Sequence, residues 1–286
     1  MVEQQSQVSL SPPIDIRPEF RKLSGMLIEF LEELEPGDWN RETISSRWRV
    51  KDIVAHLLDT SLRRVSLMRD GYREFYLERD IPEDFASQFD YLEHLNKEWV
   101  SASARLSPRV LMELTRTYDE AFCDIMDAAG MDDPAIFAVA WAGERQSRNW
   151  MDFGREYTEK WYHQQQIRLA FENRVLEAPE FMHPVYRIFM RAVPHHLKGM
   201  RHPEVQTVSL RISGPAGGQW DFRRAADCWE RATRLEQPDA VFHFDASWAW
   251  LFFTNRKFKA EMRDRVDFFG PEGAEDAVLG MLTMMA

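Results

Sequence analysis

The sequence predicts a two-domain protein, with a helical amino-terminal domain over residues 1–176 and a small α+β domain over residues 177–286. The chain has 286 residues, enough for one large or two ordinary domains. Up to about Phe171, apolar residues recur at three- and four-residue spacings, as they do in amphipathic helices. After Asn173, short alternating segments and a glycine-rich turn replace this pattern, which is typical of strands.

The helical half contains four amphipathic patterns. They cover residues 17–34, residues 50–70, a third element that continues to residue 130, and residues 149–171. The third element is interrupted at Ser107-Pro108, where proline suits a helix start, so we expect one helical arm with a break. Four long amphipathic helices predict a four-helix bundle.

The carboxy-terminal half alternates between strand and helix patterns. We expect helices at 185–197, 247–253 and 275–285, and strands at 205–212, 220–224, 228–235, 240–244 and 265–269. The glycine-rich stretch Ser213–Gly218 between the first two strands predicts a hairpin. This mixture of strands and packed helices predicts an α+β domain.

Composition excludes several classes of partner. The chain carries 36 Lys and Arg against 47 Asp and Glu, and its net charge of -11 repels the phosphate backbone of nucleic acid. No run of about 18 apolar residues predicts a membrane span, and the first residues lack the pattern of a signal peptide. The two cysteines, Cys123 and Cys228, have no metal or redox spacing, which suits a reducing cytoplasm. We therefore expect a cytoplasmic protein that binds neither nucleic acid nor membranes.

Glu159 and His163 are the first candidates for chemistry. They lie four residues apart in the last predicted helix, so their Cβ atoms are about 5–6 Å apart and both side chains could bind one metal ion. Glu156 lies about 10 Å along the helix axis from His163 and is better placed just outside such a site. Taken alone, this spacing belongs more often to a solvated helix face or a satisfied hydrogen bond than to a metal site.

His56 is the candidate for a third ligand. It lies in the middle of the second predicted helix, at the edge of the apolar stripe near Ile53 and Thr60. The position of His56 in its helix also fits an alternative in which the ring packs against the next helix and its nitrogens are hydrogen-bonded.

A resemblance to a known family connects these residues. The segment from Trp48 to Leu57, WRVKDIVAHL, resembles the segment that opens the metal-binding helix of mycothiol-dependent maleylpyruvate isomerases, a branch of the DinB-like superfamily. In that family the remaining ligands come from a Glu-x3-His pair late in the bundle, which Glu159 and His163 match. The resemblance implies a DinB-like bundle in which His56, Glu159 and His163 bind a metal.

The resemblance extends to the second domain, which in this family is similar to sterol carrier proteins. Pro238-Asp239-Ala240 and the segment Asp245–Trp250 are similar to its central part. One position differs near the predicted metal ligands: the family often has an aspartate where this chain has Gln166. The surroundings of the site therefore differ from the family pattern.

Two imidazoles and one carboxylate leave an open position on a divalent ion, zinc or alternatively nickel. A metal deprotonates a coordinated thiol, and neither cysteine lies near the ligands, so the thiol must come from solution. The resemblance implies a low-molecular-weight thiol such as mycothiol, a small electrophilic substrate, and activity as an S-transferase or isomerase.

Two other functions remain open. The same metal could generate hydroxide in a hydrolase, with Glu156 or Asp152 as proton acceptor. Alternatively the protein is not an enzyme and binds a metal or an apolar ligand. A requirement for added thiol would distinguish an S-transferase or isomerase from both the hydrolase and the non-enzyme.

Overall fold

The structure is a computed structural model that describes residues 13–45, 47–73, 88–200, 202–226, 228–254, 261, 263–281 and 283. The chain divides into two compact units. The helical unit comprises Ile16–Met131 and Glu156–Leu176. The sheet unit takes in Asp132–Arg155 and the described parts of Met1–Asp15 and Glu177–Ala286. The chain passes from one unit to the other after residue 15, on either side of Asp132–Arg155, and after residue 176. The division into domains 1–176 and 177–286 stays a prediction.

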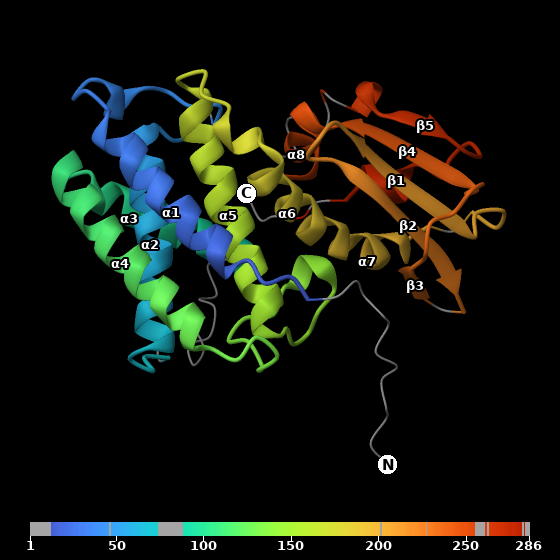
Figure 1. Ribbon diagram of the computed structural model, residues 1–286, viewed down its shortest axis with the longest axis horizontal. Helices are drawn as coiled ribbons and strands as arrows, with labels where there is room; N and C mark the ends of the chain where they lie inside the picture. The colour runs from blue at the N-terminus through green and yellow to red at the C-terminus, as the bar shows by residue number, and fades with distance from the viewer. Residues whose placement is uncertain are drawn as a thin grey trace, which may run out of the picture. The chain divides into compact units, whose positions relative to one another are not determined.

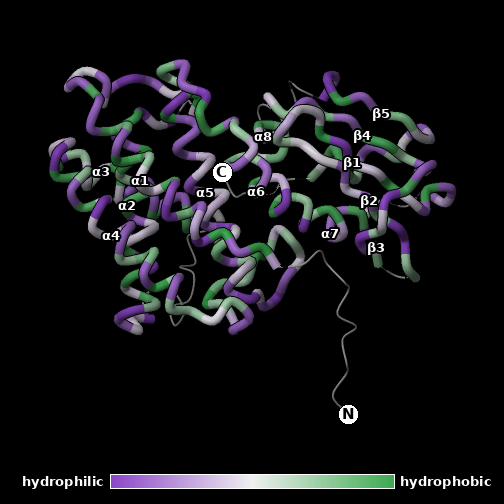
Figure 2. The backbone as a smooth tube through the Cα atoms, viewed as in Figure 1, coloured by the Kyte–Doolittle hydropathy of each residue, from purple (hydrophilic) through white to green (hydrophobic). Residues whose placement is uncertain are grey.

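Helices α1 to α4 and most of α5 form the helical unit. They are α1 (Arg17–Glu32), α2 (Val50–Met68), α3 (Gln88–Ser103), α4 (Pro108–Ala128) and α5 (Asn149–Leu169). Helix α4 packs against α1 and α2, and α3 packs against α2 (Figure 1). Their apolar faces share one core that includes Leu27, Val54 and Leu111. Polar and apolar residues are interspersed along these helices (Figure 2). Helices α1, α2 and α4 each bury one face, which is the predicted amphipathic pattern. Helix α5 differs from the prediction, because it buries most of its polar residues as well as its apolar ones between Asn149 and Arg168.

The segment on either side of Ser107 differs from the prediction. Helix α4 begins at Pro108, as predicted, and the Ser107 hydroxyl caps it by accepting a hydrogen bond from the Val110 amide at 3.3 Å. The prediction of a single broken arm is wrong, because α3 ends at Ser103 and α4 is a separate helix. The extended backbone of Ser107, with ψ of 156°, redirects the chain between them.

The sheet unit contains a five-stranded mixed sheet with strand order β3-β2-β1-β4-β5. The strands are β1 (Thr207–Ser213), β2 (Gly218–Ala225), β3 (Cys228–Arg231), β4 (Ala240–Asp245) and β5 (Asp267–Phe269). Strands β1 and β4 pair in parallel, and the other neighbours are antiparallel. The predicted hairpin is confirmed as β1 and β2. Its turn requires Gly214, whose φ is +84°, and Gly217, where a Cβ atom would lie 2.0 Å from the Ile212 carbonyl oxygen.

Four helices accompany the sheet in the described part of this unit: α6 (Pro179–Phe189), α7 (Val193–Leu197), α8 (Ala246–Thr254) and α10 (Asp276–Leu279). Helix α8 packs on β1 and β4, and the Tyr186 hydroxyl of α6 donates to the Ala246 carbonyl at 2.7 Å. The predicted helix 185–197 starts earlier and is divided into α6 and α7. The predicted helix 275–285 is shorter, and residues 282 and 284–286 lie outside the described residues. None of the described helices is both long enough and apolar enough to cross a bilayer.

Candidate metal centre

Helices α2 and α5 supply the side chains of the candidate site. At the start of α2, the Asp52 carboxylate accepts a hydrogen bond from the Arg49 amide at 3.0 Å, which satisfies a free N–H at the helix end. His56 lies one turn further along and is 8% exposed. His163 of α5 is 6% exposed. Both rings are therefore buried, whereas the helical pattern placed His56 at the edge of its apolar stripe.

The two imidazoles are in contact. Their ring centroids lie 4.7 Å apart, and the planes meet at 73°. The Trp48 indole packs on both rings, with its centroid 4.7 Å from that of His56 and 5.8 Å from that of His163. The indole therefore restricts how far either ring can rotate.

Burial keeps both imidazoles neutral. It lowers the pKa of His163 to about 4 and holds the pKa of His56 well below its ordinary value, with a smaller effect on His56 from His163 and Arg63. A neutral imidazole has one N–H and one nitrogen lone pair, which is the form that binds metals.

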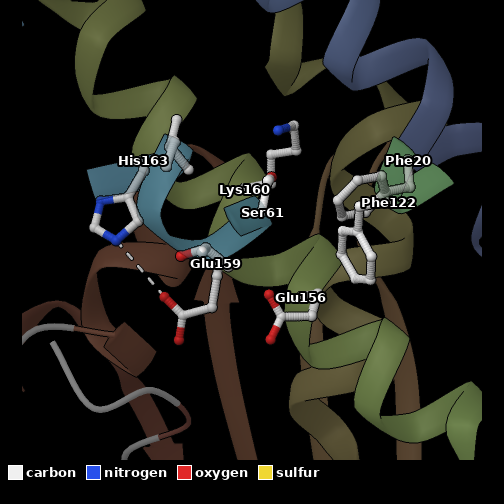
Figure 3. A pocket seen from close by; sticks show the side chains of 9 residues that line it. Phe20, Ser61, Phe122, Glu156, Glu159, Lys160 and His163 are labelled. Atoms are coloured by element: carbon white, nitrogen blue, oxygen red, sulfur yellow. Dashed lines mark ion pairs between the residues drawn. The ribbon is translucent and has the colours of Figure 1, made fainter. Parts of the chain in front are cut away.

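Each imidazole has a nitrogen that could bind a cation. His56 Nδ1 is buried and lacks a hydrogen-bond partner within the described residues. His163 Nδ1 lies 2.9 Å from Gln166 Oε1, and its Nε2 lies 3.6 Å from Glu159 Oε2 (Figure 3). The imidazole nitrogens and the carboxylate oxygen are ligand atoms of the kind that bind a divalent ion. They do not form a preassembled cluster: within the described chain, no three His, Cys, Asp or Glu side chains are close enough together to bind a metal ion.

A small pocket adjoins these groups in the helical unit. Glu156, Glu159 and His163 line it on one side (Figure 3), and His56 is not among its lining residues. The remaining lining residues are Phe20, Leu57, Thr60, Ser61, Phe122 and Lys160. Apolar rings and a few polar groups thus surround the same small space.

Two of the lining residues, Glu156 and Lys160, belong to buried ion pairs. Arg64 Nη2 lies 2.6 Å from Glu156 Oε1, and Lys160 Nζ lies 2.6 Å from Asp119 Oδ2. All four side chains are at most 4% exposed. The Ser61 hydroxyl donates a third short bond, at 2.6 Å, to Asp119 Oδ1. Such pairs require good geometry, because the desolvation of buried charges is costly.

Comparison with known proteins identifies the family. Residues 20–168 match the family model of the mycothiol maleylpyruvate isomerase N-terminal domain. The chain belongs to this family. The resemblance seen in the sequence is therefore confirmed. The matched range of the mycothiol maleylpyruvate isomerase family includes His56, Glu159 and His163.

The chain is also similar to solved structures. It is similar to the mycothiol-dependent maleylpyruvate isomerase, with 11% identity and a TM-score of 0.49 over 82% of this chain and 88% of that one. A histidine-to-alanine mutant of the same enzyme gives 10% identity with the same TM-score and coverage. No curated protein matches.

For this maleylpyruvate isomerase family member, the structure brings the predicted site residues into one region. Glu159 and His163 face each other, and the His56 ring contacts the His163 ring. Their assignment as metal ligands remains a prediction. The predicted proton acceptor Glu156 has one oxygen bound by Arg64, through Nη2 at 2.6 Å and Nε at 3.2 Å.

Sequence reasoning did not find Ser61, Arg64, Asp119 and Lys160. Two of these residues, Arg64 and Asp119, are charged positions on otherwise buried helix faces, which is a signal that the sequence contains. Arg64 follows Ser61 by three residues on the buried face of α2, and Asp119 interrupts the buried stripe that Thr115 and Phe122 continue in α4. A charged residue in an apolar stripe indicates a buried partner, but nothing in one helix shows which other helix supplies it.

Proposed function

We propose that the protein is a thiol-dependent isomerase that uses a low-molecular-weight thiol, similar to mycothiol, on a small electrophilic substrate. The family match over residues 20–168 is the observation that carries this proposal. In the proposed architecture, the helices form a DinB-like four-helix bundle in a domain that covers residues 1–176. Residues 177–286 are then a sterol-carrier-like domain, whose central strands would be β1 and β4.

In this proposal, His56, Glu159 and His163 hold a divalent metal ion, zinc or nickel. Three observations support the ligand set. Both rings are neutral because they are buried. His56 has a buried Nδ1 that no described group bonds. The His163 Nε2 and the Glu159 Oε2 lie 3.6 Å apart, close to the separation of about 3.3–3.5 Å between two ligand atoms of a tetrahedral zinc ion.

When bound, the metal lowers the pKa of a coordinated thiol and so favours the thiolate. The chain's own residues prepare the space around it. Phe20, Leu57 and Phe122 give the pocket an apolar wall that limits water, and Arg64 holds the buried lining residue Glu156 in place. Water exclusion strengthens the interactions of charged groups inside the pocket.

Isomerisation needs only reversible addition. The thiolate sulfur bonds to one carbon of an activated double bond, the π electron pair moves to the other carbon, and one proton adds there. The remaining single bond rotates, and loss of that thiolate and one proton restores the double bond in the other geometry. The thiol is regenerated and no oxidant is needed.

The test is turnover of maleylpyruvate, followed by absorbance, with and without mycothiol. Isomerisation should require the thiol and should persist in the Cys123→Ser, Cys228→Ser double variant, because neither cysteine lies near the ligands in sequence. His56→Ala with His163→Ala should lose both bound metal and activity while remaining folded. Full turnover by the cysteine-free protein without any small thiol would contradict the proposal and would favour a metal-hydroxide hydrolase.

A further inference from the structure

Gln166 makes a buried hydrogen bond with His163, and the chemistry of the two groups shows which of them donates it. The residue lies three positions after His163 in α5 and is 3% exposed. Its Oε1 is 2.9 Å from His163 Nδ1. An amide oxygen can only accept a hydrogen bond, so Nδ1 carries the hydrogen in this contact. With Nδ1–H as the donor to Gln166, Nε2 is the ring nitrogen left to bind a cation.

That nitrogen faces a carboxylate. The distance from Nε2 to Glu159 Oε2 is 3.6 Å, which is too long for a hydrogen bond. In the other tautomer, Nε2 would carry the hydrogen and could donate it to Glu159 after the two side chains moved slightly closer. The tautomer that Gln166 selects instead leaves a bare nitrogen beside a negatively charged oxygen, an arrangement that a cation between them stabilises.

We propose that Gln166 is a positioning residue: its amide oxygen holds His163 in the Nδ1–H tautomer and thereby directs the Nε2 lone pair to the cation site shared with Glu159. The inference rests on the metal site of the proposed function, but on no step of its reaction. Metal-binding histidines generally donate their second N–H to an oxygen that fixes the ring. Here that oxygen belongs to a neutral amide, so the partner adds no negative charge to the site.

Two substitutions test this role. Gln166→Met keeps the length of the side chain and removes the acceptor, so the neutral ring should change to the Nε2–H tautomer and donate to Glu159. Gln166→Glu restores an oxygen acceptor. We therefore expect the methionine variant to weaken metal binding about 10- to 100-fold. The glutamate variant should bind metal at least as tightly as the unaltered chain.

The matched control is Gln164→Met. Gln164 is an equally buried amide of the same helix, but it donates to the Leu23 carbonyl at 2.9 Å and accepts from Arg168 Nε at 3.0 Å. Its loss should reduce stability without changing the His163 tautomer or the metal affinity. A purely structural role for Gln166 would make the two methionine variants behave alike.

The measurement is ¹⁵N NMR of the metal-free protein labelled at histidine, with the His163 signals assigned from a His163→Gln variant, together with competitive titration of zinc. An unchanged Nδ1–H tautomer in Gln166→Met, unchanged zinc affinity, or no zinc binding by the unaltered chain would overturn the inference. The tautomer change and the weaker zinc binding, observed in a protein without thiol-dependent turnover, would support the inference and contradict the proposed function.

Discussion

Replacing Lys160 with methionine should destabilise the helical unit strongly. Lys160 Nζ lies 2.6 Å from Asp119 Oδ2 in a pair whose side chains are 4% and 3% exposed. Methionine fills most of the same space but leaves the Asp119 carboxylate buried, with the Ser61 hydroxyl as its remaining described hydrogen-bond donor. Breaking a buried ion pair by removing one partner costs about 3–5 kcal/mol. The Ser61 hydroxyl still donates to Asp119 in this variant, so we expect the lower end of this range.

A loss of about 3 kcal/mol corresponds to a fall in melting temperature of about 10 °C for a unit of this size. Far-UV circular dichroism during heating measures it. Arg109→Met is the surface control, because the Arg109–Glu113 pair is 85% and 58% exposed and should contribute less than about 0.5 kcal/mol.

The double variant Lys160→Met, Asp119→Leu separates charge burial from packing. Removing both charges eliminates the uncompensated carboxylate, so the double variant should be more stable than Lys160→Met alone. A loss below about 1 kcal/mol in the single variant, or a double variant that loses the sum of both single effects, would refute this reasoning.

Three further predictions concern the histidine site and the cysteines. Binding of Ni²⁺ should quench tryptophan fluorescence, and Trp48→Phe should remove most of the quenching but leave binding intact, because this indole contacts both imidazoles; unchanged quenching in Trp48→Phe would contradict the stacking. The unfolded chain binds a proton on His163 near pH 6.5, whereas burial lowers its pKa to about 4 in the folded protein. The metal-free protein should therefore have its full stability above about pH 6.5 and lose up to about 3 kcal/mol towards pH 4, and urea melts of His163→Gln should show a flatter decline. Burial raises the pKa of the Cys123 thiol to about 11, so a thiol reagent at pH 8 should label Cys228 first, as mass spectrometry of the modified peptides would show.

Local patterns explain why so much of the fold was predictable. The starts of α4 and α5 follow from Pro108 and from the apolar spacing after Asn149, and the hairpin follows from the glycines between β1 and β2. The start of α6 was missed because Pro184 lies inside it. Burial of Phe181, Ile188 and their neighbours outweighs the hydrogen bond that this proline cannot make.

The candidate site was predictable only where its residues share a helix or a family motif. Glu159 and His163 follow from helical spacing. The contact between the rings of His56 and His163 joins two helices, and periodicity within one helix cannot place it. The same holds for Arg64 and Glu156, which are 92 positions apart in the chain. These contacts depend on how helices pack, and a single helix pattern does not contain that information.

The parallel pairing of β1 with β4 constrains the order in which the sheet can assemble. Strands β1 and β2 are joined by a tight turn and can pair as soon as both are synthesised, whereas β4 reaches β1 only after β2 and β3 have been laid down. The Thr207 amide donates to Asp239 Oδ2 at 2.8 Å and the Asp239 amide donates to Thr207 Oγ1 at 2.9 Å, so both strand starts are joined when this late step is complete. Loop-closure entropy is lost before these contacts compensate for it, which makes such pairing slow. Until β4 arrives, one edge of β1 stays open, and open edges recruit strands from other chains. A nascent or truncated chain that ends before Ala240 should therefore aggregate through β1.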